Sequence, residues 1–397
     1  MDFREVYIYL LILSAFISIS IFEILVVIGL LVLIYDFFKR RINLGALSKP
    51  LLLYSSVALL STSLFNPKLI NKGLEQGLFQ ILYFFKLNNT KEIVLRINYI
   101  FIAISIILIP IVIYKYIKTG LPAPVWGGVF EVGQFYSMFS ITSFLLALFF
   151  YKKGNKLLSF IFFILTFLFI GMVFFTHRRT AILGLIIIFY LTLIVLYRNR
   201  IINKIIFWSV NILLIISVSI GYWYLSKTDT RFILLNEVIT GKKHIDKDLL
   251  NSEVLNIISS NRVAIFKDAI FIIKKDIEEK NIVNLVIGHG INSGSYLPHK
   301  YSPPQFGKYE SVFLVSEFIE IGLLGVLAEL WLIFVAFKTF LKIRIITEED
   351  IYALSLFTPL LIHLVGIAFT FFWDALLPLY LLLFKIAEYY FYRIDFD

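Results

Sequence analysis

Two adjacent arginines, Arg178 and Arg179, lie between long apolar runs in the stretch FFTHRRTAILGL, with no carboxylate within reach along the chain. A guanidinium keeps its charge at physiological pH and binds phosphate oxygens through two parallel hydrogen bonds. The pair is therefore a candidate site for a phosphate or diphosphate group. The alternative is that both side chains only extend to phospholipid headgroups at the end of a helix.

The composition is that of a protein that crosses a membrane many times. Of its 397 residues, 59% are hydrophobic and only 16% are charged, and the mean hydropathy is +0.87. A net charge of +10 would suggest nucleic acid in a soluble protein, but here most Lys and Arg lie in short loops, where the bilayer explains them. We therefore expect no nucleic-acid partner. The absence of cysteine excludes disulfides, thiolate-bound metals and a catalytic thiol.

Apolar runs bounded by charged residues predict an all-α, polytopic bundle of about twelve transmembrane helices. The first run is too long for a cleavable signal peptide and fits a helical hairpin broken near residues 18–21. The fourth run contains Glu75 and Gln76 and could instead lie in the membrane interface, but the charge pattern favours a span. The predicted spans are 6–20, 21–38, 51–65, 72–86, 93–117, 129–151, 157–176, 180–197, 204–225, 312–337, 352–371 and 373–391.

The short-loop cations predict the orientation of this bundle. If both termini are cytoplasmic, the short inside loops carry 15 Lys and Arg, and the short outside loops carry 5. Arg178 and Arg179 are among these five, so they lie against the general bias. The chain then divides into spans one to nine (1–225), one large outer loop (226–310) and spans ten to twelve (311–397).

The large loop has internal organisation. Residues 261–280 predict an amphipathic helix, and the loop that follows, 286–295, contains glycines at 288, 290 and 294 that indicate a tight irregular turn. His289 and His299 could ligate a metal, but no third ligand stands at a matching spacing. We expect no metal and no cofactor. The predicted apolar stripe of the helix consists of Phe266, Ala269, Ile270, Ile273 and Ile277.

Four motifs together resemble bacterial O-antigen polymerases and O-antigen ligases. The segment SVFLVSEFIEIGLLG (311–325) resembles the helix that follows the large external loop in that family, with Glu320 at its acidic position and Gly322 and Gly325 in its G-x-x-G. The other three motifs occur in the family's order. They are HRRTA (177–181), SNRVAIFKDA (260–269) and NLVIGHGINSGSY (284–296). Read from the residues alone, Gly322 and Gly325 would permit close helix packing.

The resemblance implies glycosyl transfer at the periplasmic face of the bacterial inner membrane. A growing polysaccharide on a polyprenyl diphosphate donor would be transferred to the next lipid-linked repeat unit, the acceptor. Ligases of the family usually carry a histidine and a small polar residue where this chain has Ser311 and Val312, so a polymerase is favoured. A ligase that transfers the polysaccharide to the lipid A core, or a flippase for the lipid-linked oligosaccharide, stays open. A flippase and a chain-length regulator of the same pathway are the expected protein partners.

The resemblance also suggests roles for individual residues. Arg178, Arg179 and Arg262 would hold the diphosphate, and Glu310, beside the position of the family's histidine, would be the general base. In the apolar segment around Glu317 an ionised carboxylate is costly, so this side chain is expected to face inward. The candidate substrate-binding residues are His289, Asn292, Ser311, Glu317, Glu131 and Gln134.

Overall fold

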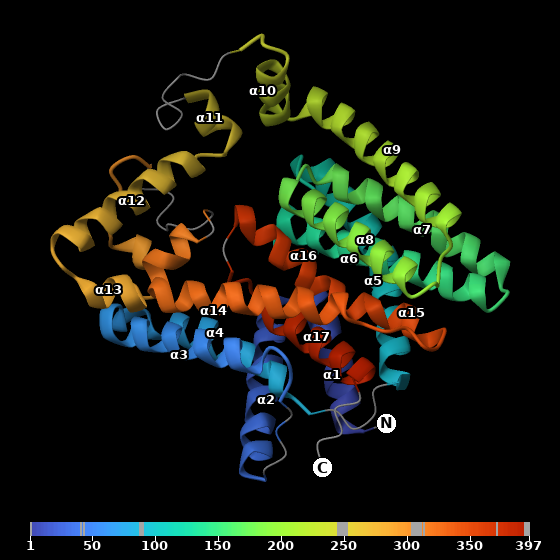
Figure 1. Ribbon diagram of the computed structural model, residues 1–397, viewed down its shortest axis with the longest axis horizontal. Helices are drawn as coiled ribbons and strands as arrows, with labels where there is room; N and C mark the ends of the chain where they lie inside the picture. Colours follow the sequence, from blue (N-terminus) through green and yellow to red (C-terminus); the bar gives the residue numbers. More distant parts are fainter. Residues whose placement is uncertain are drawn as a thin grey trace.

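The computed structural model of the protein describes residues 2–39, 42, 44–86, 91–243, 253–302, 312, 314–370 and 372–392. Every regular element within these ranges is helical, and no strand occurs in them (Figure 1). Eight helical segments there are long and apolar enough to cross a membrane, in agreement with a polytopic helical membrane protein. These segments are Ile19–Phe38, Glu92–Thr119, Val129–Lys152, Lys156–Phe175, Arg179–Arg198, Lys204–Thr228, Val315–Leu341 and Glu349–Gly366.

The helices follow one another through short connections, except between α9 and α14. The first part of the chain contains α1 (Phe3–Ile17), α2 (Ile19–Phe38), α3 (Ser48–Phe65), η1 (Pro67–Leu69), α4 (Ile70–Leu78), η2 (Phe79–Phe84), α5 (Lys91–Thr119), α6 (Val129–Lys152), α7 (Lys156–Phe175), α8 (Arg179–Arg198) and α9 (Lys204–Thr228). The long connection contains α10 (Thr230–Ile239), α11 (Glu253–Ile258), α12 (Arg262–Glu278), α13 (Ile282–Ile287) and η4 (Ser293–Ser295). The last part contains α14 (Val315–Leu341), α15 (Glu349–Ala353), η6 (Leu354–Phe357), α16 (Thr358–Gly366), η7 (Ile367–Phe369) and α17 (Leu377–Tyr392).

Short polar stretches set the helix boundaries. The side-chain oxygens of Asn155 and Asn203 accept hydrogen bonds from the amides of Leu158 and Ile206 at 3.1 and 2.8 Å, and thereby cap the first turns of α7 and α9. Ser18 is extended, with φ −159° and ψ 124°, and separates α1 from α2. The predicted break of the first hairpin near residues 18–21 is therefore confirmed.

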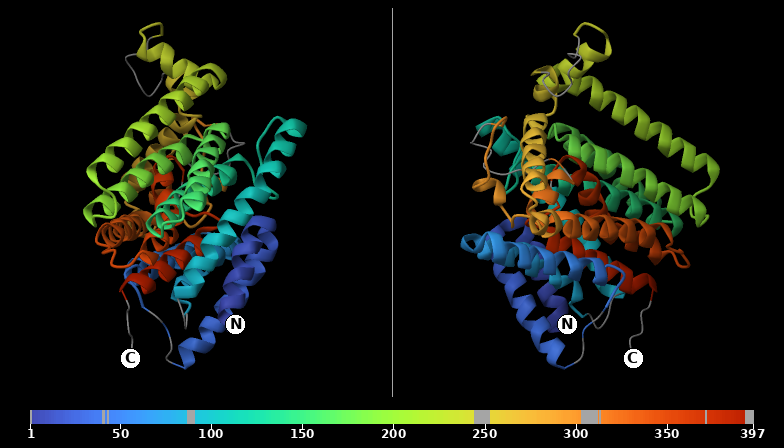
Figure 2. Two further views of the ribbon diagram at one scale, coloured as in Figure 1. Left: turned by 90° about the vertical axis from the view of Figure 1, so that its right-hand side faces the viewer. Right: turned by 60° about the vertical axis from the view of Figure 1, so that its left-hand side comes forward.

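Successive helices run between two ends of the molecule. At one end, which we call the terminal end, Arg4 donates to the Asp36 carboxylate and to the carbonyl oxygen of Lys86, at 2.8 Å in each case. These contacts join the start of α1 to the last turn of α2 and to the segment that follows η2. At the opposite end, which we call the loop end, lie α10 to α13 of the connection between α9 and α14 (Figures 1 and 2).

The four predicted spans that are not among the eight segments are helical too. They correspond to α1, α3, α4 with η2, and α17. Contacts at the terminal end fix the direction of α17, because its C-terminal half binds the residues before α3. The amine of Lys385 donates to the carbonyl oxygen of Leu44 at 2.9 Å. The carboxylate of Glu388 accepts from the amide of Ala46 at 2.5 Å.

The predicted loop helix at 261–280 is present as α12, but its predicted apolar stripe is partly wrong. Ala269 is buried as expected, whereas Ile277 is 58% exposed. The buried face is rotated and includes two carboxylates, Asp268 and Asp276. Each has its own partners: Asp268 accepts hydrogen bonds from three successive amides, those of Lys300, Tyr301 and Ser302, at 2.7 to 2.8 Å, and Asp276 binds His289 at 2.7 Å. These bonds offset the cost of burying the charges.

α14 is interrupted at Gly322, where φ is 65° and ψ is −169°. The turn after α13 packs against this interruption. The amides of His289 and Gly290 donate to the carbonyl oxygens of Ile319 and Glu320 at 2.8 and 2.9 Å. Backbone carbonyls that an unbroken helix would use internally are therefore bound by the loop.

Gly322 and Gly288 allow two backbones to touch at this break. A Cβ atom on Gly322 would lie 2.5 Å from the amide nitrogen of Gly288, and a Cβ on Gly288 would lie 2.4 Å from the carbonyl oxygen of Glu320. Both residues also have positive φ, which a side chain disfavours. Gly322 thus permits close packing, as expected from the sequence, and its partners are the end of α13 and the turn that follows. It lets a loop approach the backbone of α14.

Candidate functional site

Four arginine side chains come together at the loop end. Arg178 is the N-cap of α8 and Arg179 its first residue, Arg262 is the first residue of α12, and Arg231 lies in the first turn of α10. Their mutual electrostatic effects place them near one another. The sequence predicted Arg178, Arg179 and Arg262 but missed Arg231, which is one of many charged residues in the long connection.

Three of the four guanidiniums bind the short turn between α11 and α12. Arg179 donates to the carbonyl oxygen of Ile258 at 2.6 Å and to the hydroxyl of Ser260 at 3.2 Å. Arg262 donates to the carbonyl oxygen of Ser259 at 3.0 Å, and Arg231 approaches the same Ser260 hydroxyl at 3.4 Å. The turn 258–260 therefore holds the end of α8 and the loop helices together.

Arg231 has a carboxylate partner. Asp229, which caps α10, accepts hydrogen bonds from the guanidinium of Arg231 at 2.5 and 2.9 Å. Burial opposes ionisation of Asp229, but the hydrogen bonds and charge of Arg231 outweigh it and lower the pKa of this carboxyl. The same pair raises the pKa of Arg231, because Asp229 favours its charged form.

Burial and mutual repulsion act on the other arginines of the cluster. Burial lowers the pKa of Arg262 to about 10, and the charges of Arg179, Arg231 and Arg178 add to this effect. Burial and Arg231 also lower the pKa of Arg178, although its side chain keeps an exposed surface and Glu131 acts in the opposite direction. Repulsion of this kind is relieved by an anion, so the cluster favours a ligand with negative charge.

A cavity of about 340 Å³ opens beside Arg178. Within the part of the chain that the structure describes, the Arg178 guanidinium makes no hydrogen bond or ion pair, so its donors are available to a ligand in this cavity. The cavity has a polar side with the arginines and an aromatic side formed by the ends of α5, α7 and α9. Its lining residues are Tyr116, Gly120, Leu121, Pro122, Val129, Phe175, Thr176, His177, Arg178, Tyr224, Asp229 and Arg231.

Glu131 and Gln134 lie in the first turns of α6, next to the arginines. Glu131 accepts a hydrogen bond from the amide of Gly128 at 2.6 Å and thereby caps its own helix. Gln134 is buried. α6 and α8 approach closely here, because a Cβ on Gly133 would lie 2.7 Å from that of Ala181. Glu131 therefore lies close enough to Arg178 for its negative charge to favour the charged form of that arginine.

His289 and Asn292 lie in the turn against α14. Both ring nitrogens of His289 are occupied, one by Asp276 at 2.7 Å and the other by the amide group of Asn284 at 2.9 Å. The backbone amide of Asn292 donates to the Glu320 carboxylate at 3.1 Å. These contacts hold the turn in place. The two residues are not among those that line the cavity beside Arg178.

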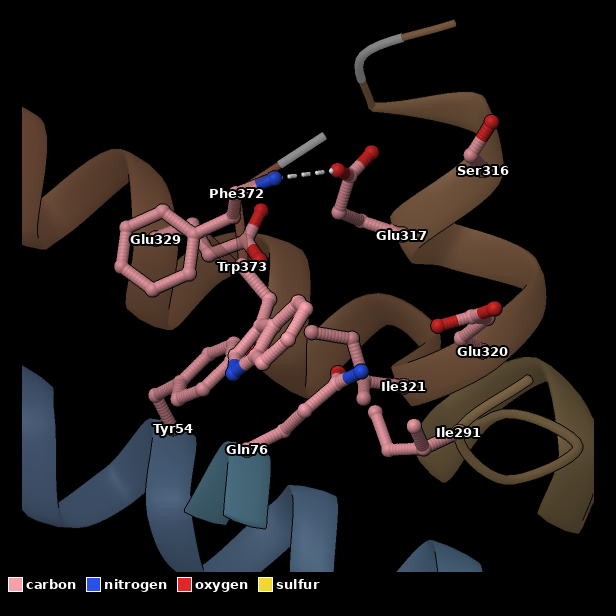
Figure 3. A pocket seen from close by; sticks show the side chains of 10 residues that line it. All are labelled: Tyr54, Gln76, Ile291, Ser316, Glu317, Glu320, Ile321, Glu329, Phe372 and Trp373. Atoms are coloured by element: carbon pink, nitrogen blue, oxygen red, sulfur yellow. Dashed lines mark hydrogen bonds between the residues drawn. The ribbon is translucent and has the colours of Figure 1, made fainter. Parts of the chain in front are cut away.

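Glu317 lies in a second, acidic pocket (Figure 3). This pocket also contains Glu320 and a residue that the sequence analysis missed, Glu329. The amide of Phe372 donates to Glu317 at 2.9 Å. A carboxylate within the predicted span 312–337 is costly unless it faces a polar site, and this signal could have identified Glu329 as well as Glu317.

Two predicted site residues, Glu310 and Ser311, lie outside the described residues. The two histidines that were weighed as metal ligands are engaged elsewhere: His299 contacts Ser302 and the carbonyl oxygen of Gly294 at 2.8 and 2.7 Å. Within the described ranges, no group of three or more His, Asp or Glu side chains is arranged to hold a metal ion.

No family model matches the chain. An uncharacterized protein of Aquifex aeolicus (strain VF5) is 49% identical over 392 residues, which cover 98% of this chain and 97% of that protein. At this identity and coverage the two chains share one fold, and the chain belongs to the same family as this protein of Aquifex aeolicus.

Proposed function

We propose that the protein is a glycosyltransferase that polymerises lipid-linked oligosaccharide repeat units into O-antigen or a related surface polysaccharide. The donor would be a polysaccharide on polyprenyl diphosphate, and the acceptor would be the next lipid-linked repeat unit. One observation carries the proposal: four arginines gather at the loop end, and Arg178 presents its free donors to a cavity. The order of the four sequence motifs supports the same activity.

The main requirement of the reaction is stabilisation of the negative charge that develops on the leaving diphosphate. A hydroxyl oxygen of the acceptor sugar attacks the anomeric carbon, the bond from this carbon to the diphosphate oxygen breaks, and the diphosphate leaves with the electron pair. The hydroxyl proton passes to a base, for which Glu310 is the candidate. Because negative charge grows on the leaving group, guanidiniums placed there lower the barrier.

The described residues suit such a donor. Arg178 would bind diphosphate oxygens in the cavity, while Arg179 and Arg262, already fixed through the turn 258–260, would supply further positive charge. The aromatic side of the cavity, where Tyr116 packs against Phe175 with ring centroids 4.6 Å apart, offers an apolar surface beside the charged one. This combination matches a ligand with a lipid or sugar next to a diphosphate.

The membrane arrangement is part of the proposal. Twelve helical segments, the eight candidates together with α1, α3, α4 with η2, and α17, would cross a bacterial inner membrane. The loop end would face the periplasm and both termini the cytoplasm. A flippase and a chain-length regulator of the same pathway would be the protein partners. The donor bond is already activated, so neither a nucleotide nor a metal is required.

The experiment that tests the function compares single replacements in cells that depend on this gene for their polysaccharide. Arg178→Lys keeps the charge but loses the planar fork, so polymer length should fall strongly at unchanged protein level. Loss of one such contact to a developing charge costs on the order of 3 kcal/mol, or about a hundredfold in rate. Arg179→Lys and Arg262→Ala should act in the same direction.

Arg96→Lys provides the matched control, because Arg96 lies at the terminal end in an exposed contact with Glu92. Wild-type chain lengths in all three cluster variants would contradict the proposal. A gene deletion separates the two transferases. Surviving molecules with a single repeat indicate a polymerase, whereas loss of all repeats from the lipid core, with long chains left on the carrier lipid, indicates a ligase.

A further inference from the structure

Three glutamates of α14 line one small pocket outside the arginine cluster (Figure 3). Glu317 and Glu320 come from the segment before the break at Gly322, and Glu329 from the segment after it. The pocket has a volume of about 10 Å³, room for about one water molecule. Among the described residues, none of those that line it is Lys, Arg or His; they are Tyr54, Gln76, Ile291, Ser316, Glu317, Glu320, Ile321, Glu329, Phe372 and Trp373.

Two of the three carboxyl groups hold loops through backbone amides. Glu317 accepts from the amide of Phe372 at 2.9 Å, in the connection between η7 and α17. Glu320 accepts from the amide of Asn292 at 3.1 Å, in the turn after α13. Hydrogen bonds donated to a carboxylate favour its ionised form. Glu317 and Glu320 are therefore the members of the group that are best able to keep a negative charge.

Glu329 is in a different situation. Its side chain is fully buried, at 0% exposure, and points into the pocket beside Phe372 and Trp373 (Figure 3). Neither of its carboxyl oxygens has a hydrogen-bond partner within the described residues. An ionised carboxylate in such a place lacks hydrogen-bond donors from the described residues, and the two nearby negative charges add repulsion. The neutral acid avoids both costs.

We propose that this pocket is a proton-binding site, in which Glu329 is a neutral carboxylic acid at neutral pH. Among the described residues, the titratable groups that face it are Glu317 and Glu320 on α14 and Tyr54 on α3. The amide of Gln76 on α4 also faces it. The proposal does not rest on the proposed glycosyl transfer, although Glu317 is also a candidate substrate-binding residue. Removal of the proton would place a third negative charge beside the two that hold the outer loops.

A hydrophobic carbodiimide tests the site, because this reagent reacts with protonated carboxyls in an apolar environment. The acid proton moves to a reagent nitrogen, the carboxyl oxygen bonds to the central carbon, and an acyl shift gives a stable N-acylurea that retains every atom of both reactants. Mass spectrometry of peptides from the intact, full-length protein locates the adduct. We expect it on Glu329 at neutral pH, with less adduct as the pH is raised.

Glu329→Gln should abolish this adduct, whereas Glu92→Gln, which alters a carboxyl exposed at the terminal end, should leave it unchanged. The wild-type protein alone gives a second readout, since a neutral acid adds an infrared C=O band that disappears at high pH. Absence of the band, or labelling that persists in Glu329→Gln, would overturn the proposal. Neither measurement requires polysaccharide synthesis. A failure of this proposal can therefore be distinguished from a failure of the proposed transferase activity.

Discussion

Arg262 is the residue in which repulsion within the cluster is most evident, since its pKa falls to about 10. An anion with two phosphate groups would reduce this repulsion. Inorganic pyrophosphate should therefore raise the melting temperature of the detergent-purified protein. At a pyrophosphate concentration one hundred times its dissociation constant, the free energy of unfolding should increase by about 2.7 kcal/mol. In Arg262→Gln the pyrophosphate-induced increase should shrink, and in Arg96→Gln it should not. Equal increases in both variants would argue against an anion site.

His177 makes the loop end sensitive to acid. Burial lowers its pKa below the ordinary value of 6.5, and Arg231 adds to this although Asp229 opposes it. The folded protein thus binds this proton less readily than the unfolded chain does. The neutral His177 therefore contributes fully to the free energy of unfolding above pH 6.5, and this stability is lost as the pH falls below 6.5. Asparagine tolerates the positive φ of 55° at this position.

His177→Asn should therefore flatten the fall in melting temperature between about pH 7.5 and about pH 5.5, the range in which an unperturbed histidine titrates. The measurement is thermal unfolding of the wild type and the variant across this range. An unchanged slope would mean that other groups cause the acid sensitivity.

At the scale of single residues, the sequence could identify the arginines that stand at helix starts. Arg178 and Arg179 follow an apolar run, and Arg262 begins an amphipathic helix. Arg231 has no such signal, because only the path of the chain brings α10 back to the end of α7, where its guanidinium approaches the carbonyl oxygen of His177 at 3.4 Å. Glu329 was missed for a different reason: its neighbours are so apolar that the segment was read only as a span.

At the scale of elements, the contact between the turn after α13 and α14 depends on two glycines. Gly322→Ala should cost at least about 2 kcal/mol, because alanine disfavours positive φ and its Cβ meets the loop backbone. Gly288→Ala should act alike. Gly171→Ala, in α7 with nothing within 4 Å of the added Cβ, should be neutral or slightly stabilising. Thermal unfolding of the three variants in detergent checks this, and equal stability would exclude the contact.

Elements were predictable where periodicity alone decides the structure. α12 begins and ends close to the predicted bounds of 261–280. Its buried face was not predictable, because carboxylates such as Asp268 and Asp276 are seldom buried unless they have partners. Their partners, among them Ser302 and His289, come from later parts of the chain. The break at Gly322 likewise results from a contact with a distant turn, and nothing in the local pattern of α14 indicates it.

At the scale of the whole molecule, orientation is open to direct measurement because the chain has no cysteine. Single cysteines at Lys242, which is exposed in the connection after α10, and at Asn155 or Asn203, at the terminal end, report the two sides. If the loop end is periplasmic, a membrane-impermeant thiol reagent added to intact cells should label Lys242→Cys alone. Labelling of the other two, with Lys242→Cys protected, would reverse the orientation and exclude an outer active site.

The small apolar core that supports α12 is shared between two parts of the chain. Ile265, Ala269 and Ile272 of α12 pack against Ile319 of α14, and the turn after α13 also binds α3, where Asn66 donates to the carbonyl oxygen of Ile291 at 2.9 Å. During synthesis the connection leaves the ribosome before α14 does, so its core is completed only when Ile319 follows. A fragment limited to residues 226–310 would therefore make a poor immunogen, because its native surface forms only when the membrane helices are present.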